Sequence, residues 1–230
     1  MKIGIILTPD NRSKAYIQKI LKNNIVLDEI IFLNNSQKEV KFSEHMIEQS
    51  KINGFDISKS VLSTLKNEKL NYKEFPFIDI NNNELIKYIQ ERNIDFLIFS
   101  GGGILKHKIL SLETKFIHFH PGIVPIYKGS TCFYYSIINE GNSGVTAFIM
   151  NEGLDTGDIL FQKTFPKPDH SFVDEIYDPH IRSETLIEVL KNNIFLEKEV
   201  IKQNPNEGNT YYIIHPVLKH IAILNCIKGK

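Results

Sequence analysis

The amino-acid sequence predicts an α/β fold built around an open, mostly parallel β-sheet. Short apolar runs recur along the chain and end in turn residues, as buried parallel strands do. Segments with apolar residues at helical spacing separate several of these runs. This alternation of strand and helix favours right-handed crossovers between neighbouring parallel strands.

In the first half of the chain, predicted strands and helices alternate from the first residues onward. The run "KIGIILT" predicts a buried strand that ends in the turn residues Pro9, Asp10 and Asn11. The segment "NNELIKYIQERN" is flanked by asparagines, which are good helix caps. In chain order, strands are expected at residues 2–8, 26–34 and 72–79, and helices from residue 13, around 57–65 and over 82–93.

The second half continues with strands and then becomes mainly helical. A long helix is expected from Asp178 to Gln203; both a core helix and a partner-binding helix fit its apolar stripe, and the core interpretation is the commoner one. The tail from Asn209 predicts a strand and a short helix. We therefore expect a catalytic domain over 1–165 and a mainly helical extension over 166–230. The expected strands are 94–105, 115–120, 143–150 and 158–165.

Composition narrows the function classes. Of the 230 residues, 27 are Lys or Arg and 27 are Asp or Glu, and this balance disfavours a nucleic-acid partner. The two cysteines, Cys132 and Cys226, predict reduced thiols and a cytoplasmic protein. No apolar run reaches the length of a membrane span, and no CxxC or HExxH pattern predicts a metal site.

Two patches carry candidate chemistry. "FIHFHPG" places His118 and His120 on one face of a strand, because side chains two apart point the same way. The following Pro-Gly turn predicts that solvent and substrate reach His120. "NEGLDTGDIL" places Asp155 in a loop with two glycines. A lone histidine is often structural, but a pair followed by this turn favours a site at the carboxyl ends of the strands.

The stretches "HFHPGIVPIYKG" and "GVTAFIMNEGLDTGDIL" resemble the tetrahydrofolate-dependent formyltransferases. The match is continuous over residues 116–160 and looser back to Met1. It implies a Rossmann-like, doubly wound sheet. By position, His120 matches the catalytic histidine and Asp155 the catalytic aspartate. His118 falls where the family has an asparagine that donates a hydrogen bond to the formyl oxygen. Either the N–H of His118 replaces that donor, or the site lacks the donor and is weakened or inactive.

The resemblance also implies the donor and its binding residues. The donor is 10-formyltetrahydrofolate, an amine attacks its formyl carbon, and no metal takes part. Glycine-containing loops suit a flat pterin because glycine allows close backbone approach. The implied donor-binding residues are Gly102, Gly103, Ile104 and Leu105 in one loop and Asn151, Glu152, Gly153 and Leu154 in another.

The resemblance implies that the acceptor is a small-molecule amine, and it is closest to the amino-sugar N-formyltransferases of surface polysaccharide synthesis. Methionyl-tRNA formyltransferases add a C-terminal barrel domain, which the short, mainly helical extension does not suggest. Glycinamide ribonucleotide formyltransferases have a glycine-serine-rich turn where this chain has "TPDNRSK". A non-catalytic folate-binding protein is the alternative function from another class. A homodimer is one expected assembly. No membrane partner is expected.

Five residues are candidates for binding that acceptor. Asn11, Arg12 and Lys14 could meet an anionic group, or could merely cap the first helix. Tyr127 and Lys128 could shape the pocket or only the turn. The polar cluster "YDPHIR", 177–182, could line the sugar site, or its Asp178 could cap the long helix.

Overall fold

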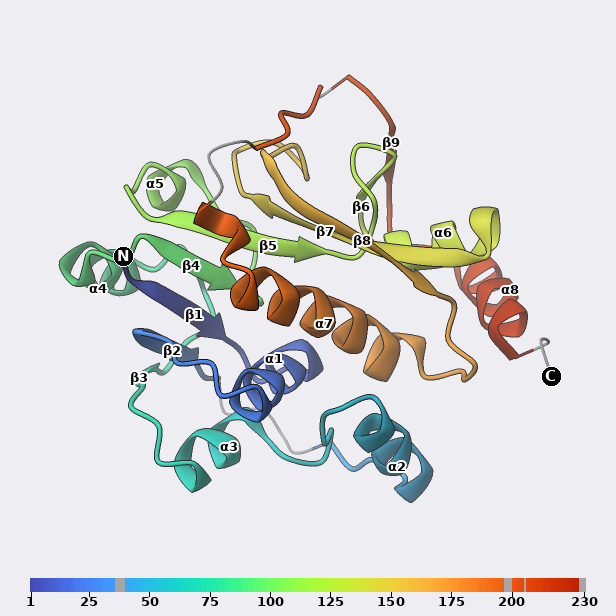
Figure 1. Cartoon of the computed structure of the whole chain (residues 1–230), viewed down its shortest axis with the longest axis horizontal. Helices are drawn as coiled ribbons and strands as arrows, with labels where there is room; N and C mark the ends of the chain where they lie inside the picture. Colours follow the sequence, from blue (N-terminus) through green and yellow to red (C-terminus); the bar gives the residue numbers. More distant parts are fainter. Residues whose placement is uncertain (36–39, 197–199, 205, 228–230) are drawn as a thin grey trace. The chain divides into compact units, whose positions relative to one another are not determined.

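The computed structural model describes residues 1–35, 40–196, 200–204 and 206–227 (Figure 1). The chain forms two compact units, Met1–His118 and Phe119–Lys230. Strand β5, Lys115–His120, begins in the first unit and ends in the second. The expected division into a catalytic domain over 1–165 and a mainly helical extension over 166–230 stays a prediction.

The first unit is built on parallel strands in the order β3-β2-β1-β4-β5. Ile5 at the centre of β1 pairs with Ile30 on β2 and with Ile98 on β4. Ile5, Ile6 and Leu7 of β1 are fully buried, so both faces of this strand are covered, as expected for a central parallel strand. The strands are β1 (Ile3–Leu7), β2 (Glu29–Leu33), β3 (Lys73–Phe75), β4 (Phe96–Phe99) and β5.

Most helices of the first unit begin at side-chain caps. Asp10 caps α1, because its Oδ1 accepts a hydrogen bond from the backbone N–H of Ser13 at 2.7 Å. Ser60 caps α3 in the same way, so the helix expected around 57–65 begins later, at Val61. The helices are α1 (Asn11–Lys22), α2 (Glu44–Ile52), α3 (Val61–Asn67), α4 (Asn83–Arg92) and α5 (His107–Leu110).

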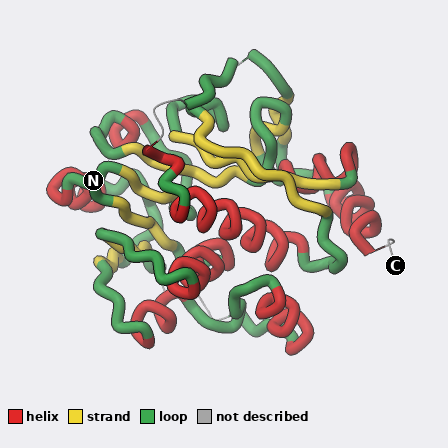
Figure 2. The backbone as a smooth tube through the Cα atoms, in the orientation of Figure 1, coloured by secondary structure: helices red, strands yellow, loops and turns green. Residues whose placement is uncertain are grey.

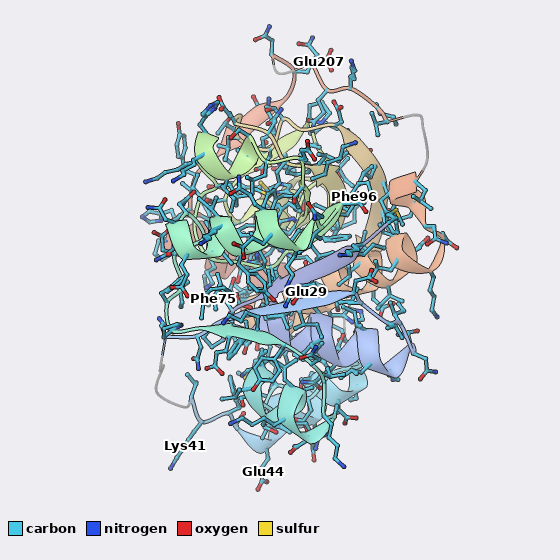
Figure 3. The ribbon with its side chains drawn as sticks, turned by 90° about the vertical axis from the view of Figure 1, so that its left-hand side faces the viewer. Glu29, Lys41, Glu44, Phe75, Phe96 and Glu207 are labelled. Atoms are coloured by element: carbon cyan, nitrogen blue, oxygen red, sulfur yellow. The ribbon has the colours of Figure 1, made fainter. Side chains whose placement is uncertain are left out.

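Helix α4 packs beside strands β2 and β3. The Tyr88 hydroxyl donates a hydrogen bond to Oε1 of Glu29 at 2.8 Å, and the Tyr88 ring lies edge-on to Phe75 at 5.5 Å. Figure 3 labels Glu29 and Phe75 on these two strands. The expected helix over 82–93 is thus confirmed, with Asn82 as its cap.

Described strands of the second unit form an antiparallel pair and a parallel pair. Figure 2 colours all strands of the chain yellow. Strands β7 (Asn142–Ile149) and β8 (Ile159–Pro166) are antiparallel, with an irregularity in register at Ala147 and Phe148. Strands β6 (Tyr127–Gly129) and β9 (Asn209–Tyr211) are parallel. The helical segments are α6 (Cys132–Glu140), the π-helix η1 (Val173–Tyr177), α7 (Asp178–Lys191), the 3₁₀-helix η2 (Ile194–Leu196) and α8 (Pro216–Ile227).

Helix α7 is a core helix. It packs against β7 and β8 (Figure 1). Its residues Ile181 and Leu186 are fully buried. The expected end at Gln203 was wrong, because α7 ends at Lys191. Asn192 is the C-cap and Asn193 takes a left-handed φ of 50°, a conformation that asparagine tolerates well.

The α/β class predicted from the sequence is confirmed, as are the strand and short helix of the tail, β9 and α8. Helix α2 was not predicted, because the stretch 35–70 shows no clear periodicity. Within the described ranges, every helix is too short or too polar to cross a lipid bilayer.

Candidate active site

His120 and Asp155 meet within the second unit. His120 is the last residue of β5, and Asp155 lies in the loop between β7 and β8. His120 Nδ1 is 3.4 Å from Asp155 Oδ2. The histidine is 2% exposed and the Asp155 side chain 12% exposed. The sequence motif therefore brings together a buried imidazole and a nearly buried carboxylate.

Backbone groups of β6 hold both members of this pair. His120 Nε2 lies 2.9 Å from the carbonyl oxygen of Tyr127, and the backbone N–H of Gly129 donates to Asp155 Oδ2 at 2.7 Å. The Pro-Gly turn makes this approach possible, because a Cβ on Gly122 would lie 2.7 Å from His120 Nε2. The turn is fixed in place by Thr146 on β7, whose hydroxyl donates to the Gly122 carbonyl at 2.7 Å.

Burial lowers the pKa of His120 below its ordinary value, and the Arg182 cation acts in the same direction, while Asp155 opposes both. The neutral imidazole carries one N–H, yet its two nitrogens face two acceptors, Asp155 Oδ2 and the Tyr127 carbonyl. A proton gained by the ring would therefore find an acceptor at once. This arrangement suits a residue that takes up and returns a proton.

The expectation that solvent reaches His120 was wrong. The segment after the Pro-Gly turn folds back as β6 and covers the Nε2 edge of the ring with the Tyr127 carbonyl. A substrate proton can reach Nε2 only if it replaces that carbonyl contact.

The loop that carries Asp155 is internally braced. Asn151 Oδ1 accepts hydrogen bonds from the Gly153 N–H and the Thr156 hydroxyl, both at 3.0 Å. Asp155 has a left-handed φ of 53°, a conformation that costs on the order of 1 kcal/mol and is common at functional sites. A Cβ on Gly157 would overlap the Ile149 carbonyl, so only glycine fits there.

The other residues of this loop that were predicted to bind the donor are exposed. Leu154 leaves 58% of its surface open to solvent. Asn151, Glu152 and Gly153 are also exposed. An apolar side chain displayed beside Asp155 fits a role in contacting a flat ring.

His118 lies two residues before His120 on β5, so the two side chains project from the same face of the strand. It is half-buried, and its ring centroid is 5.9 Å from that of Phe99 on β4.

The glycine loop after β4 belongs to the first unit. Gly102 and Gly103 have φ values of 125° and 102°, a region that favours glycine. Asn81 fixes the loop, since its Nδ2 donates to the Ile104 carbonyl at 2.9 Å. Ile104 is 86% exposed, whereas Leu105 is buried and can offer a ligand only its backbone.

Three predicted acceptor-binding residues lie on the first turns of α1. Arg12 Nη1 donates to the Ser100 carbonyl at 2.7 Å. Lys14 Nζ donates to the Ile57 carbonyl at 2.9 Å, and burial lowers the pKa of this amine. Asn11 begins the helix, but the capping side chain is that of Asp10. The alternative of a capping role is therefore wrong for all three.

The two predicted residues of β6 are buried in the turn. The Tyr127 hydroxyl donates to Glu140 Oε1 at 2.7 Å, and burial raises its pKa to about 12. Lys128 is 5% exposed, and its Nζ donates to the Glu207 carbonyl at 2.6 Å. These contacts favour the turn interpretation over direct contact with a substrate.

The cluster "YDPHIR" contains a buried contact with β5 that sequence reasoning missed. Asp178 and Arg182 form a buried ion pair on α7, and Arg182 reaches back to the carbonyl of Phe119 on β5. The i, i+4 spacing of an acid and a base on a helix was the available signal. Cys132 at the start of α6 is fully buried, and burial raises its pKa to about 12, which favours packing over nucleophilic chemistry.

Comparison with known families settles the family. The formyl transferase family model matches residues 5–187, which is most of the chain. The chain belongs to the formyl transferase family. This agrees with the resemblance carried by His120, Asp155 and the segments around them.

Curated relatives in this family include methionyl-tRNA formyltransferases. That of Caldanaerobacter subterraneus subsp. tengcongensis is 31% identical over 163 residues, which is 65% of this chain and 52% of the relative. That of Ehrlichia canis is 33% identical over 145 residues, which is 58% of this chain and 47% of the relative. The chain thus spans about half the length of the curated relatives that it matches.

Solved structures with a similar fold include sugar N-formyltransferases. One from a Shewanella species has a TM-score of 0.61 at 19% identity, covering 98% of this chain and 88% of that chain. An N-formyltransferase from Helicobacter canadensis, in complex with folinic acid and dTDP-3-aminofucose, has a TM-score of 0.62 at 20% identity, covering 99% and 80%. These likenesses confirm the Rossmann-like α/β fold predicted from the sequence.

Proposed function

We propose that this chain transfers a formyl group from 10-formyltetrahydrofolate to the primary amine of an amino sugar or sugar nucleotide. The observation that carries the proposal is the contact between His120 Nδ1 and Asp155 Oδ2, 3.4 Å apart in a family of formyl transferases. A neutral imidazole beside a carboxylate is suited to general acid–base catalysis, which contributes roughly 10²–10⁴-fold to rate.

The proposed roles follow from the protonation states of the pair. The folate supplies the formyl carbon, to which the amine nitrogen bonds as the bond to the folate nitrogen breaks. His120 is neutral because burial lowers its pKa, so it can accept the proton that the amine loses. Asp155 stabilises the imidazolium, and the same proton is then available to the leaving nitrogen. His118, on the same face of β5, is proposed to donate a hydrogen bond to the formyl oxygen.

The proposed donor-binding residues lie in two loops, 102–105 and 151–154, and each loop has an exposed apolar side chain. Ile104 in the glycine loop and Leu154 beside Asp155 each offer an exposed apolar side chain to a planar ring. A folate-derived donor is supported by the Helicobacter canadensis relative, whose structure contains folinic acid.

An amino-sugar acceptor is supported by the sugar N-formyltransferases among the similar folds. The equal number of acidic and basic residues gives no general attraction for a nucleic acid. The proposed acceptor contacts remain Asn11, Arg12 and Lys14, with Tyr127 and Lys128 shaping the turn. An anionic group that bound Arg12 would have to replace its contact with the Ser100 carbonyl. Methionyl-tRNA is the second candidate acceptor, because the curated relatives act on it by name.

The test is formyl transfer from 10-formyltetrahydrofolate, detected by mass spectrometry as the gain of one formyl group. Acceptors are 3- and 4-amino sugar nucleotides, free amino sugars, glycinamide ribonucleotide and methionyl-tRNA. The expected result is transfer to a sugar amine by the wild type and none by His120→Ala. The matched control is His107→Ala, which removes a histidine from α5 outside the pair. Transfer to methionyl-tRNA alone would overturn the proposal of a sugar acceptor. Transfer to none of these acceptors would overturn the proposal that the chain is a formyltransferase.

A homodimer is part of this proposal. Helix α8 turns an apolar face to solvent: Val217, Leu218 and Ile221 are 60%, 40% and 41% exposed. Such a face favours an apolar partner surface. Light scattering of the wild type and of Val217→Lys with Ile221→Lys tests the assembly. A monomeric mass for the wild type would contradict it.

A further inference from the structure

The strongest unexplained feature of the second unit is a buried ion pair at the start of α7. Asp178 and Arg182 are one helical turn apart, and both are buried. Arg182 Nε donates to Asp178 Oδ1 at 2.6 Å. Taking two charges out of water is costly, and replacing such a pair by apolar residues is often neutral or stabilising. A contribution to stability is thus a weak explanation for the pair.

The pair is attached to the residue beside the catalytic histidine. Arg182 Nη1 donates to the carbonyl oxygen of Phe119 at 2.8 Å. That carbonyl belongs to the peptide bond whose nitrogen is that of His120, so the guanidinium fixes the peptide plane from which the imidazole projects. A planar guanidinium with several donors can bind a carboxylate and a carbonyl at once, whereas an ammonium offers a single nitrogen.

The local helix geometry sets this contact. The π-helical turn η1 ends at Tyr177, directly before Asp178, and Pro179 follows at the start of α7. Proline has no N–H to donate, so it suits the first turn of a helix. Asp178 and Arg182 then share one face of α7 by their i, i+4 spacing.

The charged and titratable groups that face His120 come from several elements. Asp155 comes from the loop after β7, and Asp178 and Arg182 come from α7. The Cys132 thiol, at the start of α6, lies near Asp155 and Arg182. His118 precedes His120 on β5. Of these, the Arg182 cation disfavours a proton on His120, and the two carboxylates favour one.

We propose that Arg182, oriented by Asp178, is a positioning residue that holds His120 for proton transfer by binding the Phe119 carbonyl. This rests on the proposed formyl transfer. Arg182 acts through the backbone of β5 and through its charge. The ion pair therefore sets both the direction of the imidazole and the pH below which it stops acting as a base.

The test compares charge-changing variants by their pH–rate profiles. In Arg182→Met, loss of the cation leaves Asp178 unpaired, so the acidic limb moves to higher pH, and kcat falls roughly ten- to a hundredfold with KM little changed. In Asp178→Asn, loss of the carboxylate moves the limb to lower pH. The matched control is Lys163→Met, which breaks the partly exposed ion pair of α7 with β8 at Glu188 and leaves the limb in place.

Arg182→Lys separates position from charge. It keeps the cation but cannot span both partners, so kcat falls while the acidic limb stays near the wild-type pH. If circular dichroism shows that Arg182→Met does not fold, Arg182→Lys replaces it as the test of the proposal. A folded Arg182→Met or Arg182→Lys variant with the wild-type kcat would overturn the proposal. It would also be overturned if the acidic limbs of the pH–rate profiles of Arg182→Met and Asp178→Asn moved in the same direction.

A second readout does not depend on activity. The titration of His120 is followed by NMR, its signal assigned by its absence in His120→Gln. The expected result is a higher His120 pKa in Arg182→Met and a lower one in Asp178→Asn, relative to the wild type. If the wild type transferred no formyl group, the proposed function would fail, and this titration would still decide the role of the ion pair: an unchanged pKa in both variants would overturn it.

Discussion

Asp155 Oδ2 faces two groups at once, the Gly129 N–H at 2.7 Å and His120 Nδ1 at 3.4 Å. The first contact fixes the carboxylate and the second lets it act on the imidazole. Structure and charge can therefore be separated at this position, because an amide oxygen can still accept from Gly129 but carries no charge.

We expect Asp155→Asn to fold as the wild type does and to lose roughly 10²–10⁴-fold in kcat, because imidazolium formation at His120 is no longer stabilised. Steady-state formyl transfer and thermal unfolding measure the two effects. Asp158→Asn, three residues along the same loop, is the control and should keep full activity. Equal activity of the two variants would show that the Asp155 charge takes no part.

Gly122→Ala tests the close approach of the turn to His120. The added Cβ would lie 2.7 Å from both His120 Nε2 and the Tyr127 carbonyl, so the ring or β6 must move. We expect a loss of about 1–3 kcal/mol in the free energy of unfolding and a large loss of kcat. The comparison is Gly141→Ala, where a Cβ has open space and φ is 71°. Gly141→Ala should lose stability through backbone strain but keep its kcat, and a similar loss of kcat in both would contradict the steric explanation.

The sequence predicted the meeting of His120 and Asp155 better than it predicted the groups around them. The HxHPG and DTG motifs located His120 and Asp155, because side-chain identity is visible in sequence. The prediction that solvent reaches His120 was wrong because the backbone carbonyl of Tyr127 covers the ring. Every residue has a backbone carbonyl, so the sequence does not indicate such a contact. Arg182 was missed as a positioning residue for the same reason, since its partner on β5 is the Phe119 carbonyl.

Most strands of the fold were predictable because buried parallel strands are short apolar runs with clear ends. The end of α7 was not, because Ile194 continues the apolar stripe beyond the break. The break itself depends on Asn193, which takes a left-handed φ of 50°. The two adjacent asparagines were the only local signal, and they are too common in this chain to mark an end by themselves.

The stability of the protein should depend on pH through His120. The folded pKa of His120 lies below the unfolded value of about 6.5, so the folded state binds fewer protons than the unfolded state over that interval. The contribution is therefore fully present above the unfolded pKa and is lost as pH falls through the folded pKa. Urea unfolding of the wild type and His120→Gln from pH 8 to pH 5 measures it. We expect the wild type to lose stability more steeply than the variant as pH falls, and parallel curves would contradict a lowered pKa.

His118 can be tested against the family's asparagine. It projects from the same face of β5 as His120, and its ring lies beside that of Phe99. If it donates to the formyl oxygen, His118→Ala should lower kcat by roughly 10²–10³-fold, the usual cost of removing such a donor. His118→Asn should restore much of that loss, because an amide also offers an N–H, whereas His118→Leu should not. The kcat values of the three variants decide between a donor and a packing residue: equal activity of His118→Asn and His118→Leu would assign His118 to packing against Phe99 alone.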